Sequence, residues 1–120
     1  MQYLLLIYSE ESKSIQASDP RYPGLVEEHR ALIKETTDKG ILLGAEPLEP
    51  TSTATTVRVR EEKIQTTDGP FAETKEQLAG YYLIECQNLD EAIEYAARIP
   101  NARSGSIEIR PLMKIPEPSN

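Results

Sequence analysis

Two predicted strands are apolar at nearly every position, and this pattern restricts the fold more than any other feature of the sequence. Residues 3–8 and 78–86 carry apolar side chains on both of the faces that alternate along a strand. A strand of an antiparallel sheet with one face in water should instead alternate apolar and polar residues. Both faces of these two strands therefore need a cover.

The rest of the chain predicts two helices and further strands around this pair. Pro23 is tolerated in the first turn of a helix and Gly40 is a good helix stop, whereas Asn88 can cap a second helix that Pro100 ends. The expected helices span residues 23–39 and 89–99, and the expected strands span 2–8, 41–45, 53–60, 63–67, 78–87 and 106–110.

Without the hairpin arm at 63–67, the order of elements is β-α-β-β-α-β, which is the ferredoxin-like (split βαβ) pattern. In that fold the two apolar strands are central and two helices cover one face of the sheet. A second copy of the sheet is the simplest cover for the other face. We therefore predict an α+β, ferredoxin-like sandwich that pairs as a homodimer in a dimeric α+β barrel. One domain is expected over residues 1–113, with a C-terminal tail over 114–120.

Composition argues against several classes of partner. Twenty acidic and thirteen basic side chains give a net charge of −7, whereas a nucleic-acid surface needs a basic patch. The apolar runs are too short to span a membrane. The single cysteine, Cys86, cannot form an internal disulfide and fits a reducing compartment, so we expect a cytoplasmic protein. One histidine and one cysteine argue against a zinc site, and we expect no metal and no cofactor.

The only histidine, His29, lies within the apolar stripe of the first predicted helix. At about 100° per residue, Leu25, Val26, Leu32 and Ile33 surround it on a helical wheel. Histidine is the side chain that exchanges protons near neutral pH, so His29 is a candidate general acid or base for a small-molecule ligand. The structural alternative is a core histidine whose ring nitrogens are hydrogen-bonded.

A functional histidine needs a carboxylate that orients its ring and raises its pKa. Glu10, just past the first strand, and Asp68, directly before Gly69-Pro70, are the two candidates. As alternatives, Glu10 is an ordinary exposed acid and Asp68 is a turn former that bonds its own backbone.

Three further residues are candidates for binding a substrate. Arg58 and Arg60 share one face of a predicted strand and would bind an anionic group, unless they form a solvated face. Tyr8 offers a phenol at the end of the first strand, although a core or interface role also fits it.

The segment at residues 67–84, TDGPFAETKEQLAGYYLI, closely resembles the signature of the DGPF group of YCII-related proteins. Segments 3–8, 43–46, 55–60, 89–92 and 107–111 continue the resemblance in order, so that it covers almost all of residues 1–112. The resemblance implies a ferredoxin-like subunit that pairs as a dimeric α+β barrel. It also implies a functional histidine in the first helix, matched by His29, and an aspartate after the first strand, where this chain has Glu10.

Two functions from different classes follow. The family that the chain resembles includes a few dehydrochlorinases and some relatives near muconolactone-isomerase-like enzymes. This membership favours a cofactor-free lyase or isomerase in which His29 is paired with Glu10 or Asp68. Genes of the group often accompany extracytoplasmic-function sigma factors, which favours a non-catalytic ligand-binding or regulatory dimer. A deep apolar pocket holding His29 and a carboxylate would support the enzyme, and a filled barrel would support the regulatory dimer.

Overall fold

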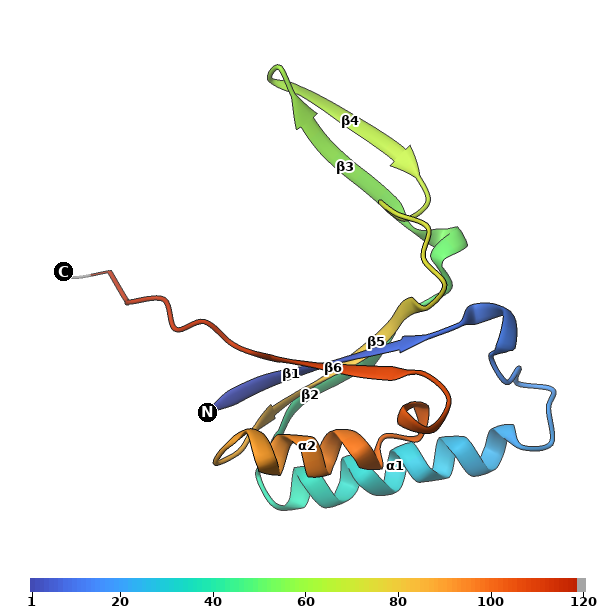
Figure 1. Cartoon of the computed structure of the whole chain (residues 1–120), viewed down its shortest axis with the longest axis vertical. Helices are drawn as coiled ribbons and strands as arrows, with labels where there is room; N and C mark the ends of the chain where they lie inside the picture. Colours follow the sequence, from blue (N-terminus) through green and yellow to red (C-terminus); the bar gives the residue numbers. More distant parts are fainter. Residues whose placement is uncertain (119–120) are drawn as a thin grey trace.

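The computed structural model describes residues 1–118 as an α+β fold with one main antiparallel sheet (Figure 1). The main sheet contains β1 (Gln2–Ser9), β2 (Leu42–Pro47), β5 (Gln77–Glu85) and β6 (Ser106–Pro111). The two α-helices are α1 (Tyr22–Asp38) and α2 (Leu89–Arg98), and a separate hairpin contains β3 (Thr55–Arg60) and β4 (Lys63–Asp68). Short 3-10 helices follow three of these elements: η1 (Glu11–Lys13), η2 (Thr51–Thr53) and η3 (Pro100–Arg103).

The element order predicted from the sequence is confirmed. Every predicted strand and helix is present, and the bounds differ by no more than about two residues, as is usual at element ends. The strand order is β2-β5-β1-β6, so the two apolar strands are central as expected, with each neighbouring pair antiparallel. The Asn88 side chain caps α2 by accepting a hydrogen bond from the Glu91 amide at 3.0 Å.

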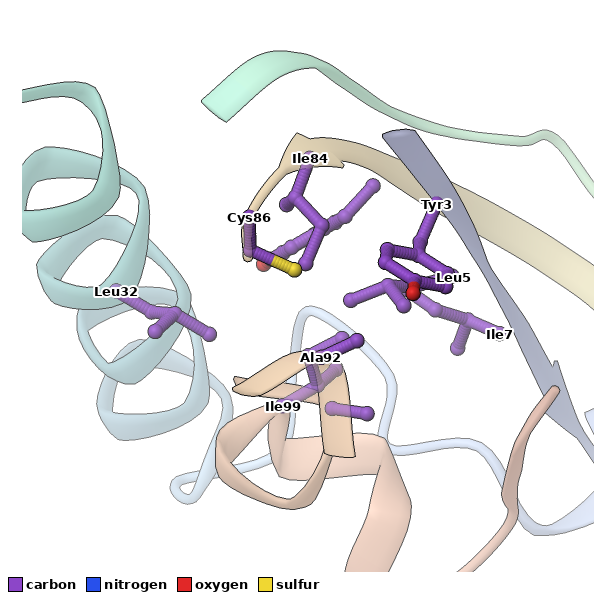
Figure 2. Close-up of a cluster of buried hydrophobic side chains, with 10 residues drawn as sticks. Tyr3, Leu5, Ile7, Leu32, Ile84, Cys86, Ala92 and Ile99 are labelled. Atoms are coloured by element: carbon purple, nitrogen blue, oxygen red, sulfur yellow. The ribbon is translucent and has the colours of Figure 1, made fainter. Parts of the chain in front are cut away.

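One face of the sheet packs against both helices and forms the core. Alternate residues of β1 point to this face, and Leu5 lies opposite Tyr82 of β5 in the sheet register. Figure 2 shows Leu32 of α1 and Ala92 of α2 pointing toward this cluster of strand side chains. Cys86 is buried in the same cluster and is a core residue.

Among the described residues, no helix covers the other face of the sheet (Figure 1). Its central residues pair as Leu4 with Leu83 and Leu6 with Tyr81, and all four side chains are only half-buried. Figure 1 shows α1 and α2 together on the opposite side of the sheet. We call this surface the open face, and it comprises Leu4, Leu6, Tyr8, Tyr81 and Leu83.

The hairpin and the C-terminal segment extend away from the sheet (Figure 1). The predicted tail begins at 114, and residues 112–118 contain no helix or strand. Residues 119–120 of that tail lie outside the described residues. Within residues 1–118, no helix combines the length and the apolar character needed to cross a bilayer.

Candidate functional site

His29 contacts a buried tyrosine of the main sheet. Leu32, three residues later on α1, is buried in the core, and His29 lies one turn before it on the same side of the helix. Its Nδ1 is 2.7 Å from the hydroxyl of Tyr82, which reaches it from the helix-covered face of β5. The two rings meet edge to face, with their centroids 6.2 Å apart.

Burial sets the protonation of both partners. Burial lowers the pKa of His29, while the Asn101 side chain and the negative charge of Glu28 partly oppose that shift. Burial also raises the pKa of Tyr82 to about 12. Near neutral pH, the neutral phenol therefore faces an imidazole whose charged form is disfavoured.

The elements around this pair bring further polar residues close to His29. Glu28 precedes it on α1 and forms an ion pair with Arg103 of η3 at 2.8 Å. The Arg103 charge also lowers the pKa of His29. Sequence reasoning missed this group, because η3 begins at Pro100 and has no periodic pattern, and because nothing distinguishes Tyr82 from the other apolar residues of its strand.

The structure does not bring Glu10 or Asp68 to His29 within one chain. Glu10 forms an ion pair with Lys13 at 3.2 Å, because η1 turns the chain so that residues three apart lie side by side. Asp68 ends β4 opposite Thr55 and is exposed on the hairpin. Among residues 1–118, His29 forms no hydrogen bond or ion pair with either carboxylate. The catalytic roles of the three residues stay predictions.

The carboxylate of Glu11, rather than that of Glu10, is built into the fold. Its two oxygens accept hydrogen bonds from the amide and the hydroxyl of Thr51 at 2.8 and 2.9 Å, and its own amide donates to the Gln77 side chain at 3.0 Å. These bonds join the end of β1 to η2 and β5. The alternation along β1 ends at Ser9, so no sequence pattern distinguished Glu11 from its neighbour.

Glu11 also lies in the wall of a cavity of about 390 Å³ at the base of the hairpin. Residues from η2 and from the loop after β4 form the rest of the wall: Thr51, Ser52, Gly69, Pro70, Ala72, Glu73, Thr74 and Gln77. The loop that carries the Asp-Gly-Pro-Phe motif therefore lines a cavity to which His29 does not contribute.

The three predicted substrate-binding residues lie apart from His29. Tyr8 is on the open face, where its hydroxyl donates to Glu108 at 3.4 Å, and both burial and the Glu108 charge raise the pKa of Tyr8. Arg58 and Arg60 are on the hairpin, and Arg60 donates to the Val59 carbonyl at 3.0 Å. Their binding roles stay predictions. Among the described residues, no three metal-ligating side chains are grouped closely enough to hold a metal ion.

These features define a small α+β protein in which one face of the sheet is covered by two helices, one of which carries His29. The other face of the sheet is apolar and open. The sequence model of the YCII-related domain matches residues 1–116. The chain therefore belongs to the YCII-related family, which confirms the resemblance found in the sequence.

Two known proteins show how far the similarity extends. An uncharacterised protein of Rhizobium meliloti (strain 1021) is 40% identical over 114 residues, which cover 93% of this chain and 92% of that protein. A solved structure of 5-chloro-2-hydroxyhydroquinone dehydrochlorinase from Burkholderia phenoliruptrix AC1100, in complex with 2,5-dihydroxybenzoquinone, is 10% identical, with 94% of each chain covered and a TM-score of 0.46.

Proposed function

We propose that this chain is a cofactor-free acid/base enzyme, lyase-like or isomerase-like, in which His29 transfers a proton of a small-molecule substrate. The 2.7 Å contact between His29 Nδ1 and the Tyr82 hydroxyl carries this proposal. A half-buried imidazole with a lowered pKa is uncharged near neutral pH and can accept a proton. Positioned proton transfer of this kind contributes roughly 10²–10⁴-fold to a rate.

In this role the two ring nitrogens have different tasks. The proposal requires the tautomer in which Nδ1 carries the proton and donates it to the Tyr82 oxygen, because only this tautomer leaves the lone pair of Nε2 for the substrate. Nε2 takes a proton from a carbon next to a carbonyl, and the electrons of the broken C–H bond form a carbon–carbon double bond as the carbonyl π electrons move onto oxygen. In the isomerase case the imidazolium then returns the proton at another carbon and the carbonyl re-forms. In the lyase case the electrons return from oxygen and a leaving group on the neighbouring carbon departs with its electron pair.

Tyr82 takes the orienting position that the sequence assigned to a carboxylate. A hydroxyl whose pKa is about 12 keeps its proton at neutral pH, so Tyr82 orients the ring without acting as the base. The negative charge that favours the imidazolium comes from Glu28, which Arg103 holds in an ion pair. Tyr8, on the open face, and Arg58 and Arg60, on the hairpin, lie apart from His29, so this proposal gives them no contact with the substrate at the His29 ring within one chain.

Deuterium exchange tests this proposal without a known substrate. A panel of small ketones, lactones and hydroxyquinones with acidic C–H bonds is incubated with the protein in D₂O, and exchange is followed by NMR. We expect the wild-type protein to accelerate exchange for at least one compound, His29→Gln to abolish the effect and Tyr82→Phe to reduce it. Lys34→Gln, on the exposed side of the same helix, is the matched control. Equal exchange by wild type and His29→Gln would contradict an acid/base role for His29.

One observation favours the second function, ligand binding without turnover by a regulatory dimer. The cavity of about 390 Å³ is lined by the motif loop and by Glu11, but not by His29. A ligand bound there would contact the motif loop and Glu11 but not His29. Its binding would therefore not require His29 as a base. In an NMR fragment screen, this function predicts shifts of the Gly69 and Thr74 amides that persist unchanged in His29→Gln.

We also propose that the protein is a homodimer in which two open faces pack together as a dimeric α+β barrel. The apolar centre of the open face has charged side chains at its margins, from Glu46 on β2 and from Glu108 and Arg110 on β6. An apolar centre with a polar rim is the usual anatomy of an interface between proteins. Burying this centre stabilises the pair by about 25 cal/mol per Å² of apolar surface.

Light scattering tests the pairing. We expect a dimer mass for the wild-type protein at micromolar concentration and a monomer mass for Leu6→Lys, because lysine would place a charge at the centre of the interface. A wild-type monomer at that concentration would contradict the proposed pairing. Circular dichroism checks that Leu6→Lys keeps its fold.

A further inference from the structure

The β3–β4 hairpin lacks the packing that a two-stranded sheet needs. Among residues 1–118, the two strands pair only with each other and join no third strand, and each has six residues. An isolated hairpin of this kind is marginally stable in water. Its register puts Val59 opposite Ile64 and Val57 opposite Thr66, so that three apolar side chains share one face. Val57 and Val59 are each 59% exposed and Ile64 is 75% exposed.

We propose that this hairpin is an arm that packs on a second copy of the chain and buries Val57, Val59 and Ile64, which we call the arm stripe. The inference rests on the proposed pairing of open faces and adds a second contact to it. Each copy would hold the other with its own arm, because a two-fold dimer makes every contact twice.

The position of the arm favours a second copy as its partner. Figure 1 shows the hairpin on the side of the sheet opposite to the two helices, which is the side of the open face. A copy seated on the open face therefore lies on the side toward which the arm projects. The arm stripe and the open face are both apolar surfaces without a cover in one chain, and one partner would cover both.

The charge of the arm is compatible with this partner. The face of the hairpin opposite to the arm stripe carries Arg58, Arg60 and Lys63. Within the hairpin, three basic and three acidic residues cancel, so the net charge of −7 belongs to the rest of the chain. These basic side chains lie on the far face of the arm, so they would form no direct ion pairs under the stripe. An arm without net charge would meet the acidic body of the other copy without the like-charge repulsion that opposes association.

The loop at the base of the arm extends the same apolar surface. Phe71, in the Asp-Gly-Pro-Phe motif, is 80% exposed. Its loop is tied to β3 by hydrogen bonds from the Gly69 amide to the Ala54 carbonyl at 2.7 Å and from the Thr56 hydroxyl to the Gly69 carbonyl at 2.8 Å. Aromatic side chains are common anchors at interfaces between proteins, and the backbone two residues before Phe71 is held by these bonds. The motif would thus supply an anchor for the partner as well as a cavity wall.

Sedimentation equilibrium on matched variants tests the arm. The arm variant is Val59→Lys with Ile64→Lys, and its control is Gln65→Lys with Thr67→Lys, which adds the same charge on the other face of the same hairpin. We expect the arm variant to raise the dimer dissociation constant at least tenfold, and the control to dimerise at least as tightly as the wild-type protein. Equal weakening of both variants would contradict a role for the stripe.

Hydrogen exchange separates failure of the arm from failure of the open-face pairing. In a wild-type dimer, the amides of β3 and β4 should be protected, and this protection should fall at least tenfold in the monomeric Leu6→Lys protein. If the wild-type protein is a dimer but hairpin protection is the same in both proteins, the arm inference is wrong and the open-face pairing stands. If the wild-type protein is a monomer, both are wrong.

Discussion

The hydroxyl of Tyr82 lies 2.7 Å from Nδ1 of His29, and this hydrogen bond joins helix α1 to strand β5. Tyr82 reaches the histidine from the helix-covered face of the sheet, whereas its neighbour Tyr81 belongs to the open face. The proposed proton-transfer site and the proposed dimer interface therefore lie on opposite faces of one sheet. Variants that separate the dimer at the open face leave the His29–Tyr82 contact within each chain.

The energy of this contact can be measured by a double-mutant cycle. Tyr82→Phe should lower the free energy of unfolding by about 1 kcal/mol, because it removes one hydrogen bond from a partly buried ring nitrogen. His29→Leu should cost on the order of 1–3 kcal/mol, because the buried Tyr82 hydroxyl then has no partner. The double variant should cost less than the sum, with a coupling energy of about 1 kcal/mol in urea unfolding.

The same cycle shows whether the hydrogen bond between His29 and Tyr82 stabilises the core. If the coupling is absent and His29→Leu is more stable than the wild-type protein, the hydrogen bond does not contribute to the core. Tyr81→Phe, one residue away on the open face, is the control for removing a hydroxyl without touching His29.

Stability should fall with acidification in the range where His29 titrates. The pKa of His29 is lowered in the folded chain, mainly by burial, from an ordinary value of 6.5. The unfolded chain therefore binds a proton first as the pH falls through 6.5, and the folded state loses stability toward the lower folded pKa. The binding of one proton changes the free energy of unfolding by at most about 1.4 kcal/mol per pH unit, and the partial exposure of His29 reduces this slope.

Urea unfolding between pH 7.5 and 5.5 measures this slope. The pKa values of Glu35 and Asp19 are lowered to about 2 by their basic partners, so those carboxylates lose their contribution only at more acidic pH. Because His29 is the only histidine, His29→Gln should remove the slope. If the slope is unchanged in His29→Gln, the pH dependence of stability comes from a group other than His29.

Gly80 allows strands β2 and β5 to approach each other closely. A Cβ atom at this position would lie 2.7 Å from the Glu46 carbonyl oxygen and 3.2 Å from the Pro47 Cα. We expect Gly80→Ala to destabilise the fold by about 1–3 kcal/mol, because backbone atoms of β2 would have to move. Gly44→Ala is the control on the facing strand, since a Cβ there meets nothing within 4 Å. Equal melting temperatures for the two variants would contradict the close approach.

The sequence was sufficient for the elements and their order because local signals and apolar patterns agree in this chain. The apolar residues of β1 and β5 identified the central strands, and the Asn88 cap and Pro100 bounded α2 closely. The inward position of His29 followed from the helical spacing of Leu32 and its neighbours.

The partner of His29 could not be predicted, because it depends on how α1 lies across the sheet. A helical pattern identifies the buried face but not the strand residue beneath it, so Tyr82 was indistinguishable from other aromatic core residues. Glu10 was selected for its place after β1, whereas the 3-10 turn of η1 directs its carboxylate to Lys13. The direction of the hairpin likewise depends on contacts at its base, such as that of Glu11 with Thr51.

The turn of the hairpin is strained, and relieving that strain should order the arm. Glu61 and Glu62 both have positive φ angles, 52° and 65°, in a two-residue turn where Asn-Gly is the favoured pair. Glu61→Asn with Glu62→Gly should therefore stabilise the hairpin by about 1–2 kcal/mol, seen as slower hydrogen exchange of the β3 and β4 amides. Glu61→Gln with Glu62→Gln is the matched control, because it removes both charges but keeps the strained backbone. If the control slows exchange as much as the Asn-Gly variant, repulsion between the two carboxylates, and not backbone strain, destabilises the turn.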